Sequence, residues 1–165
     1  MFYQSVNIFK TFFLFFVLSF FKIVNAYEYE AIVVKVTDGD TINVQTKGEI
    51  FKIRLLYIDA PEKNQDYGNS SRDFLKNIIM NKKVIIDTIK NDRYGRQLAE
   101  IYLYTSDKRI FINAKMIKSG NAWVYRSDRS NHYLMNLENH ARTNKLGLWS
   151  NYSPVEPWKF RKKKY

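Results

Sequence analysis

Cysteine is absent from this chain of 165 residues, which excludes a disulfide framework, a thiolate zinc site, a cysteine nucleophile and an iron–sulfur cluster. Acidic residues are scarce as well, 16 against 27 lysines and arginines, so the formal net charge is +11. This balance favours a polyanionic partner, either nucleic acid or an anionic membrane, and composition does not decide between them. A hydrophobic content of 45% is too high for a disordered chain, and the length suits one domain with its own core.

A hydrophobic run of full membrane-spanning length is missing too. The apolar run Thr11–Phe21 follows Lys10 and would span about 17 Å as a helix, roughly half of a bilayer core. We therefore predict a secretory signal peptide over residues 1–26, cleaved after Ala26, where Val24 and Ala26 match a signal-peptidase site. The mature protein is then expected to be secreted or periplasmic. The alternatives are an uncleaved anchor with weak membrane attachment and a buried N-terminal helix.

The mature chain contains no internal repeat and no low-complexity linker, so we expect one domain over residues 27–150, followed by a basic, aromatic tail over residues 151–165. The tail carries five lysines and arginines and no acid after Pro157, whereas the body from Tyr27 to Pro157 has a net charge of only +4. Bulk charge therefore does not identify the function of the domain.

Alternating and β-branched patterns predict the strands Ile32–Val36, Thr41–Val44, Glu49–Ile58, Val84–Ile89, Gln97–Tyr104 and Arg109–Ile112. Helical stripes predict the helices Asn69–Asn81, Asn113–Ser119 and Tyr133–Lys145, the first with Asn69, Ser70 or Ser71 as its cap and the second capped by Asn113. This mixed order predicts a mainly β, α+β fold, and closing the strands into a small barrel would remove their exposed edges.

Charged residues stand at both ends of one apolar segment. Arg54 precedes the segment, and Asp59 and Glu62 follow it, which suggests a mouth where a buried strand leaves the core. Pro61 favours an extended conformation at Ala60 and removes an amide donor, so a backbone carbonyl is left available there.

Two other turns add charged groups to this mouth. The hairpin turn Asp38-Gly39-Asp40 supplies a second carboxylate, and a site of carboxylate and carbonyl oxygens favours Ca²⁺ or Mg²⁺ over zinc when cysteine is absent and only two histidines exist. The turn Asp92–Arg96 supplies a second arginine. Each turn alone is most simply an ordinary surface turn. Together, the metal-binding carboxylates, a further carboxylate as base and two arginines for phosphate oxygens suggest a phosphodiesterase.

The same segments recur in one known family. They are Asp38-Gly39-Asp40-Thr41, Arg54, Asp59-Ala60-Pro61-Glu62, Asp92-Arg93-Tyr94-Gly95-Arg96 with Leu98-Ala99, Gly120 with Ala122-Trp123-Val124-Tyr125, and Gly147-Leu148-Trp149-Ser150. On these residues, the stretch from Ala31 to Ser150 resembles the staphylococcal nuclease family, or thermonucleases. The resemblance implies an OB-fold, five-stranded barrel with roughly three helices, and a calcium-dependent endonuclease that acts on DNA and RNA.

The resemblance also implies roles for single residues. The implied ligands of one Ca²⁺ ion are Asp40, Asp59 and the carbonyl of Ala60. The implied catalytic residues are Arg54 and Arg96, which bind the phosphate, and Glu62, the general base. The implied substrate contacts are Arg93, Tyr94 and Tyr125. The expected products carry a 5′-hydroxyl and a 3′-phosphate, and a flexible single strand should enter such a site more easily than a stacked duplex.

Two other classes of function stay open. One is a non-catalytic nucleic-acid-binding module with the same barrel, although degenerate copies would be expected to lose some of the acids and arginines. The other is a membrane-surface protein whose basic tail lies on anionic lipid. A solvated tail and a tail that contacts phosphate are equally compatible with the charge run. We expect His132 and His140 to be surface or packing residues, and the protein to be a monomer without a stable protein partner.

Overall fold

The computed structural model describes residues 27–163. The predicted signal peptide over residues 1–26 lies outside the described residues, as do the last two residues of the tail. In the described part, no helix is long and apolar enough to cross a membrane.

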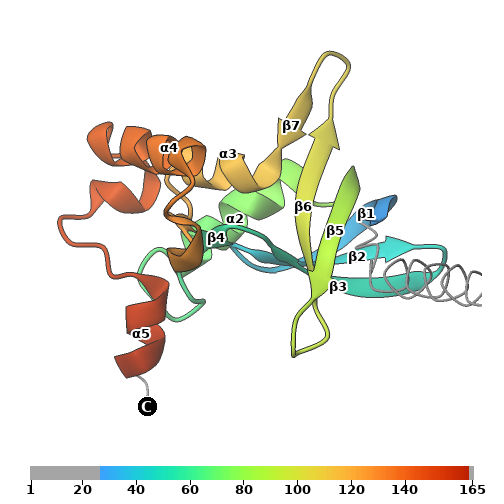
Figure 1. Cartoon of the computed structure of the whole chain (residues 1–165), viewed down its shortest axis with the longest axis horizontal. Coiled ribbons are helices and arrows are strands. Elements are labelled where there is room, and N and C mark those ends of the chain that lie inside the picture. The colour runs from blue at the N-terminus through green and yellow to red at the C-terminus, as the bar shows by residue number, and fades with distance from the viewer. Residues whose placement is uncertain (1–26, 164–165) are drawn as a thin grey trace, which may run out of the picture.

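Five strands form a closed barrel, shown on the right of Figure 1. Neighbouring strands of the sheet follow the order β3-β2-β1-β5-β6-β7, and an additional parallel pairing of β3 with β6 joins the sheet to itself. The barrel strands are β1 (Tyr27–Asp38), β2 (Thr41–Thr46), β3 (Glu49–Leu55), β5 (Lys83–Asn91) and β6 (Gln97–Tyr104). The predicted α+β fold with an OB-type barrel is confirmed.

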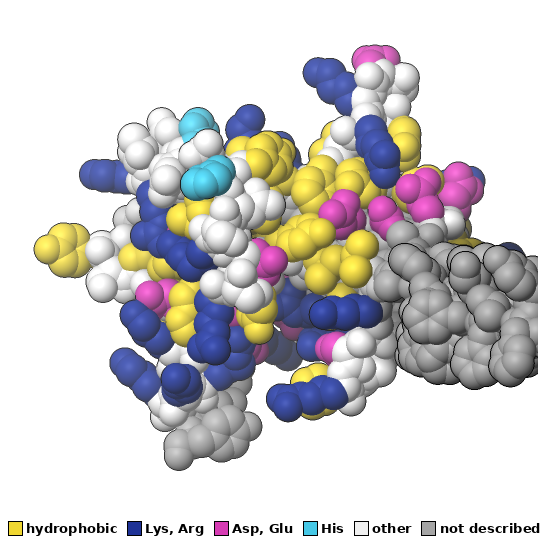
Figure 2. Space-filling model, in the orientation of Figure 1, with side chains coloured by type: hydrophobic (Ala, Val, Ile, Leu, Met, Phe, Trp, Pro, Cys, Tyr) yellow, Lys and Arg dark blue, Asp and Glu magenta, His cyan; other side chains and the backbone are white. Residues whose placement is uncertain are grey.

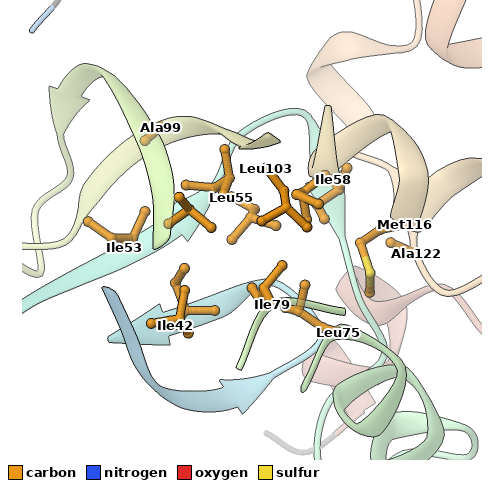
Figure 3. Packing of buried hydrophobic residues seen from close by; sticks show 14 of the residues in the cluster. Ile42, Ile53, Leu55, Ile58, Leu75, Ile79, Ala99, Leu103, Met116 and Ala122 are labelled. Carbon is orange, nitrogen blue, oxygen red and sulfur yellow. The ribbon is translucent and has the colours of Figure 1, made fainter. Parts of the chain in front are cut away.

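The barrel interior is filled by aliphatic side chains from alternate strand positions. Val33, Ile42, Ile53 and Ile101 are completely buried, each on a different strand of the barrel. Figure 3 shows how Leu55 and other strand residues meet side chains of the helices in one cluster. Because successive side chains of a strand point to opposite faces, this alternation places the polar residues of the same strands on the outside and at the barrel mouths.

The helices gather at one end of the barrel, on the left of Figure 1. The described part of the chain contains α2 (Gly68–Ile79), α3 (Ile112–Lys118), α4 (His132–Thr143) and α5 (Pro157–Lys163). The shorter elements are β4 (Ile58–Asp59), β7 (Arg109–Phe111), β8 (Trp123–Val124), η1 (Arg126–Asp128) and η2 (Gly147–Ser150).

The predicted strand Glu49–Ile58 is broken in the structure. It ends at Leu55 and resumes as β4, because Tyr57 has a left-handed backbone (φ 67°) that turns the chain out of the barrel sheet. Asn113, predicted as a helix cap, instead donates from its side chain to the carbonyls of Leu56 and Ala99 and accepts from the amide of Ile101. A buried amide side chain therefore adds hydrogen bonds to backbone groups beside the break, where the carbonyl of Ala99 also accepts the amide of Leu56 at 3.0 Å.

Two other local predictions are corrected. Helix α2 begins at Gly68 after a left-handed Tyr67, without a side-chain cap, so the cap predicted at Asn69, Ser70 or Ser71 is wrong. Four helices are present in the described residues, one more than the three predicted, because the tail forms α5.

A buried acid ties α4 to β8. Glu138 is completely buried, accepts a hydrogen bond from the amide of Val124 at 2.7 Å and pairs with Arg142 at 2.7 Å and Arg129 at 3.3 Å. Arg142 also stacks on Trp149, with its guanidinium carbon 3.8 Å from the ring centroid. Since β8 pairs with β4, these contacts fix the strand that ends at Asp59.

Candidate active site

The turn between β1 and β2 places Asp40 next to the end of β4. Asp38 accepts the amide of Asp40 at 3.0 Å, which stabilises the tight turn. The side chain of Asp40 then accepts the hydroxyl of Thr41 at 3.0 Å and the amide of Ala60 at 2.8 Å. Asp40 is only 6% exposed, so its carboxylate is a fixed group and not a solvated surface charge.

The close approach of this turn to its neighbours depends on Gly39. A Cβ at Gly39 would overlap the hydroxyl of Ser71 in α2 and would lie 2.7 Å from the Cβ of Ala60, nearer than real Cβ contacts come. The missing side chain at Gly39 thus allows the β1–β2 turn, β4 and α2 to meet at one point.

Asp59 ends the two-residue strand β4, which pairs with β8. It is 1% exposed. Burial raises the pKa of this carboxyl, and a hydrogen bond from Arg161 acts against the rise. The pKa of Asp38 is raised too, first by burial and then by the charge of Asp40. Several acids are therefore concentrated where charge is costly unless cations neutralise it.

Arg54 neutralises two of these acids at once. Its Nη2 lies 3.0 Å from Asp40 Oδ2 and 3.2 Å from Asp59 Oδ1. Its Nη1 donates to the carbonyls of Leu55 at 2.8 Å and Ile58 at 2.9 Å. Four acceptors hold the guanidinium in one orientation, and the two carboxylates are drawn to the same nitrogen.

Glu62 follows on the loop after β4 and faces solvent more than the other acids, with 39% of its side chain exposed. Its backbone amide donates to the side chain of Gln65 at 3.1 Å, and its carbonyl accepts the amide of Gln65 at 2.8 Å. A tight turn therefore fixes the backbone of Glu62. The carboxylate is 2.7 Å from Arg161 Nη1. The structure thus joins Arg54, Asp40, Asp59 and Glu62 into one cluster.

Arg96 belongs to a second group of charges, on the turn between β5 and β6. Its Nε donates to Asp92 at 2.7 Å, and Asp92 also accepts the amides of Tyr94 and Arg96. These bonds lower the pKa of the Asp92 carboxyl, although burial opposes them. The guanidinium of Arg93 lies 4.8 Å from the centroid of the Tyr94 ring, which is 69% exposed.

The β3–β6 pairing relates this second group to the first. Arg54 of β3 is the register partner of Leu98 in β6, and Arg96 stands two positions before Leu98. Arg96 itself lies in the turn just before β6, so the register places it beside the β3–β6 seam that carries Arg54. No hydrogen bond or ion pair among the described residues links Arg93, Tyr94 or Arg96 to the carboxylate cluster.

Tyr125 follows β8, and its amide donates to the carbonyl of Tyr57 at 2.7 Å. Its side chain is 39% exposed. Within residues 27–163, it makes no hydrogen bond to the predicted site residues. His132 and His140 are both exposed on α4, away from the acids of the cluster.

No preformed group of three or more His, Cys, Asp or Glu side chains converges like a metal site in the described range. The donor set nevertheless fits a hard cation. Asp40 and Asp59 are buried carboxylates held by the same arginine nitrogen, and the carbonyl of Ala60 receives no hydrogen bond within residues 27–163. Carboxylate and carbonyl oxygens are the ligands that Ca²⁺ takes.

Sequence reasoning missed two residues of this cluster. Asp38 lies in the same turn as Asp40, and the turn motif was already visible. Arg161 comes from α5, and its contacts with Asp59 span 102 positions of the chain, so no local pattern in the sequence connects the two. The tail's run of cations was the one available signal.

A closed β-barrel that carries buried acids bridged by arginines fits one class of protein, the phosphodiesterases. Comparison with known proteins agrees with that class. The family model for staphylococcal nuclease homologues matches residues 52–151. The chain belongs to the staphylococcal nuclease family and is a nuclease.

Several bacterial relatives match over most of their length. An uncharacterized endonuclease of Escherichia coli O157:H7 is 43% identical over 132 residues, which cover 80% of this chain and 84% of that protein. A micrococcal nuclease of Shigella flexneri is 35% identical over 142 residues, which cover 82% of each chain. An uncharacterized endonuclease of Haemophilus influenzae is 37% identical over 131 residues, or 79% of this chain and 71% of that protein.

Proposed function

We propose that this nuclease is a calcium-dependent endonuclease that hydrolyses phosphodiester bonds in DNA and RNA, with one Ca²⁺ ion held by Asp40, Asp59 and the carbonyl of Ala60. The observation that carries the proposal is Arg54, which bridges the two buried carboxylates through one nitrogen at 3.0 and 3.2 Å. An arrangement that concentrates two buried acids beside a fixed guanidinium is costly to fold, and it is expected where a cation and a phosphate must be bound together.

The residues of the chain divide the chemistry between them. A bound Ca²⁺ ion would neutralise charge that develops on the phosphate oxygens. Arg54 and Arg96 donate hydrogen bonds to those oxygens and stabilise the same charge. Glu62 is the most exposed of the three site carboxylates, so it can meet an attacking water and take its proton.

Substrate contacts away from the reacting phosphate come from the exposed residues Arg93, Tyr94 and Tyr125. An exposed tyrosine ring offers a stacking face that any base can use, and an arginine attracts phosphate, so recognition does not depend on sequence. We propose single-stranded DNA and RNA as the preferred substrates, and products with a 5′-hydroxyl and a 3′-phosphate.

We also propose that the enzyme acts outside the cytoplasm, because residues 1–26 have the composition of a signal peptide. The measurement is the intact mass of the protein recovered from the culture medium or periplasm. A mass that begins at Tyr27 is expected, and a full-length mass in the membrane fraction would contradict cleavage after Ala26.

Activity is tested with the full chain in a mild non-ionic detergent, on labelled single-stranded DNA with Ca²⁺ or with a chelator. Cleavage is expected with Ca²⁺ and none with the chelator. Direct labelling of the products by a polynucleotide kinase, without prior phosphatase, would show the 5′-hydroxyl.

Three variants assign the roles. Arg96→Ala is expected to lower kcat by about 10²–10³, as removal of one donor to a developing oxyanion does, and Glu62→Gln to lower it strongly without unfolding the protein. Arg109→Ala is the matched control, since Arg109 pairs with the exposed Glu28 at 3.5 Å. This substitution is expected to leave kcat unchanged. Intact DNA with the wild-type chain in both Ca²⁺ and Mg²⁺ would refute metal-dependent cleavage.

A further inference from the structure

Helix α5 turns the tail back toward the candidate site. Figure 1 places α5 below β4, and Figure 2 shows lysine and arginine side chains gathered over that part of the molecule. Pro157 is buried, and the ring of Trp158 packs edge-on against Trp123, with centroids 5.9 Å apart. From its charge, the tail was expected to be a solvated end or to contact phosphate or lipid. In the structure it is docked on the domain through residue 163.

One cation of α5 reaches the acids of the site. Arg161 holds Asp59 with both of its terminal nitrogens, Nη2 at 2.8 Å from Oδ2 and Nη1 at 3.1 Å from Oδ1. The same Nη1 lies 2.7 Å from Glu62. Hydrogen bonds to these acids raise the pKa of the Arg161 guanidinium. Arg161 thus covers both a proposed calcium ligand and the proposed general base.

The remaining attachment of the tail is limited to a few points. The side chain of Gln65 donates to the carbonyl of Val155 at 2.5 Å. Beside this bond, a pocket of about 470 Å³ separates the loop that contains Gln65 from the chain around Tyr152. Tyr152 itself is fully exposed. A segment that stands off the domain in this way can detach without exposing the barrel core.

Arg161 and a divalent cation compete for Asp59 in this arrangement. Both oxygens of Asp59 are already bonded to Arg161, and Oδ1 is shared with Arg54. A calcium ion on the same oxygens would stand beside the positive charge of Arg161 as well as that of Arg54, and like charges repel strongly at a buried carboxylate. Residues 52–151 match the family model, so α5 lies beyond the matched segment.

We propose that Arg161 is a tethered competitor of the metal ion, which holds Asp59 and Glu62 until a divalent cation displaces it and α5 is released. This inference rests on the calcium site proposed above. Arg161 sets the apparent calcium affinity, because only the fraction of molecules with a released tail can load the ion. A tail that is docked nine-tenths of the time weakens the apparent affinity about tenfold.

Calorimetric titration of Ca²⁺ into the full chain in detergent, without substrate, tests the competition. Arg161→Gln is expected to bind Ca²⁺ about tenfold more tightly than the wild type, and Arg161→Lys to fall between the two. Lys162→Gln is the matched control, because it removes the same charge from the same helix without a contact to Asp59, and its affinity should stay within about twofold of the wild type.

The outcomes separate this inference from the proposal on which it rests. Equal or weaker calcium binding by Arg161→Gln would overturn the competition and leave the calcium site standing. An equal gain in Lys162→Gln would overturn it too, since the effect would then be one of net charge. The absence of calcium binding in every variant would overturn the calcium site and the competition together.

Release of the tail has a second readout that does not depend on affinity. Trp158 lies against Trp123 only while α5 is docked, so Ca²⁺ should change the tryptophan emission of the wild type. In Arg161→Gln the same change is expected at lower Ca²⁺ concentrations or before Ca²⁺ is added. A constant emission in a wild type that binds Ca²⁺ would show that α5 stays docked, which contradicts displacement.

Discussion

Arg54 performs two tasks that are usually separate. It is 14% exposed, and it bonds two backbone carbonyls as well as two buried carboxylates. The carbonyls of Leu55 and Ile58 flank the break between β3 and β4, so the guanidinium also fastens the bend that carries Asp59. A side chain that stabilises the bend in this way is held rigid for the phosphate binding proposed for it.

We predict that Arg54→Lys lowers both stability and activity. A lysine ammonium is a point charge that cannot reach four acceptors at once, so two buried carbonyls or acids lose a partner. The free energy of unfolding in urea should fall by about 2 kcal/mol. Arg72→Lys is the control, because Arg72 pairs only with the neighbouring, exposed Asp73, and it should change stability by less than about 0.5 kcal/mol. Equal losses in the two variants would contradict this view of Arg54.

Much of this cluster could be predicted from the sequence. Arg54, Asp59 and Glu62 are close along the chain, and charges that bracket an apolar strand indicate a barrel mouth. Asp40 was predicted from its hairpin turn, and the structure brings it to Asp59. Arg161 could not be predicted, because its position depends on how the tail packs on Trp123, a tertiary contact without a local signature.

Among the secondary-structure elements, the β1–β2 turn and α2 meet closely at Gly39 and Ser71. Ser71 of α2 donates its hydroxyl to the carbonyl of Asn121 at 2.6 Å, so it is fixed from the far side and cannot move away from Gly39. The turn, the helix and the segment before β8 therefore form one packed unit around Asp40. The sequence predicted the turn and the helix separately. It did not predict their close contact, because that contact arises from tertiary packing.

We predict that Gly39→Ala destabilises the protein by about 1–3 kcal/mol, the usual cost of overpacking. The added Cβ overlaps Ser71 and Ala60, and relief of that overlap must shift Asp40. Calcium affinity should fall along with the midpoint of thermal unfolding. Gly48→Ala is the control: its φ is +83° but no atom lies within 4 Å, so it should lose stability without losing calcium affinity. Unchanged calcium binding in Gly39→Ala would argue against this coupling.

The boundaries that the sequence did not predict arise from single backbone conformations. Patterning alone made Glu49–Ile58 one strand, because its apolar residues continue through the bend. The left-handed Tyr57 interrupts the strand. At that interruption, the buried side chain of Asn113 donates a hydrogen bond to the carbonyl of Leu56. A tyrosine in a sequence does not predict a left-handed strand break, and an asparagine does not predict the hydrogen bonds beside it, since both residue types occur in many settings.

For the whole molecule, calcium should act as a stabilising ligand. If Ca²⁺ binds the folded state alone, the free energy of unfolding rises by about 2.7 kcal/mol at a hundred times the dissociation constant. Scanning calorimetry of the full chain should show a higher midpoint with Ca²⁺ than with a chelator. Asp40→Asn should abolish the shift, and Glu30→Gln should keep it, because Glu30 pairs with Lys83 on the exposed side of β1. A shift that survives Asp40→Asn would place the ion elsewhere.

Alkaline pH should weaken the fold through a half-buried tyrosine, Tyr29. Burial raises the pKa of Tyr29 to about 12, despite hydrogen bonds with Thr88 and Gln97, from an ordinary value of 10.0. Between these values the folded state keeps the proton that the unfolded state releases, so the free energy of unfolding decreases as pH rises from about 10 to 12. Urea unfolding at several pH values should show a shallower decrease in Tyr29→Phe. Tyr27→Phe, at an exposed position, is the control and should retain the wild-type slope.

The parallel pairing of β3 with β6 has a consequence for the cell that makes this enzyme. Ile53 and Gln97 are far apart along the chain, so their contact is non-local and costs loop-closure entropy. Arg54 stands on β3 and Arg96 on the turn just before β6, so the closed seam holds in place the two segments that carry the arginines proposed to grip the phosphate. A nascent or unfolded chain, in which this seam is open, therefore has the residues of the site without their arrangement, and we expect it to spare the nucleic acids of the cell that makes it.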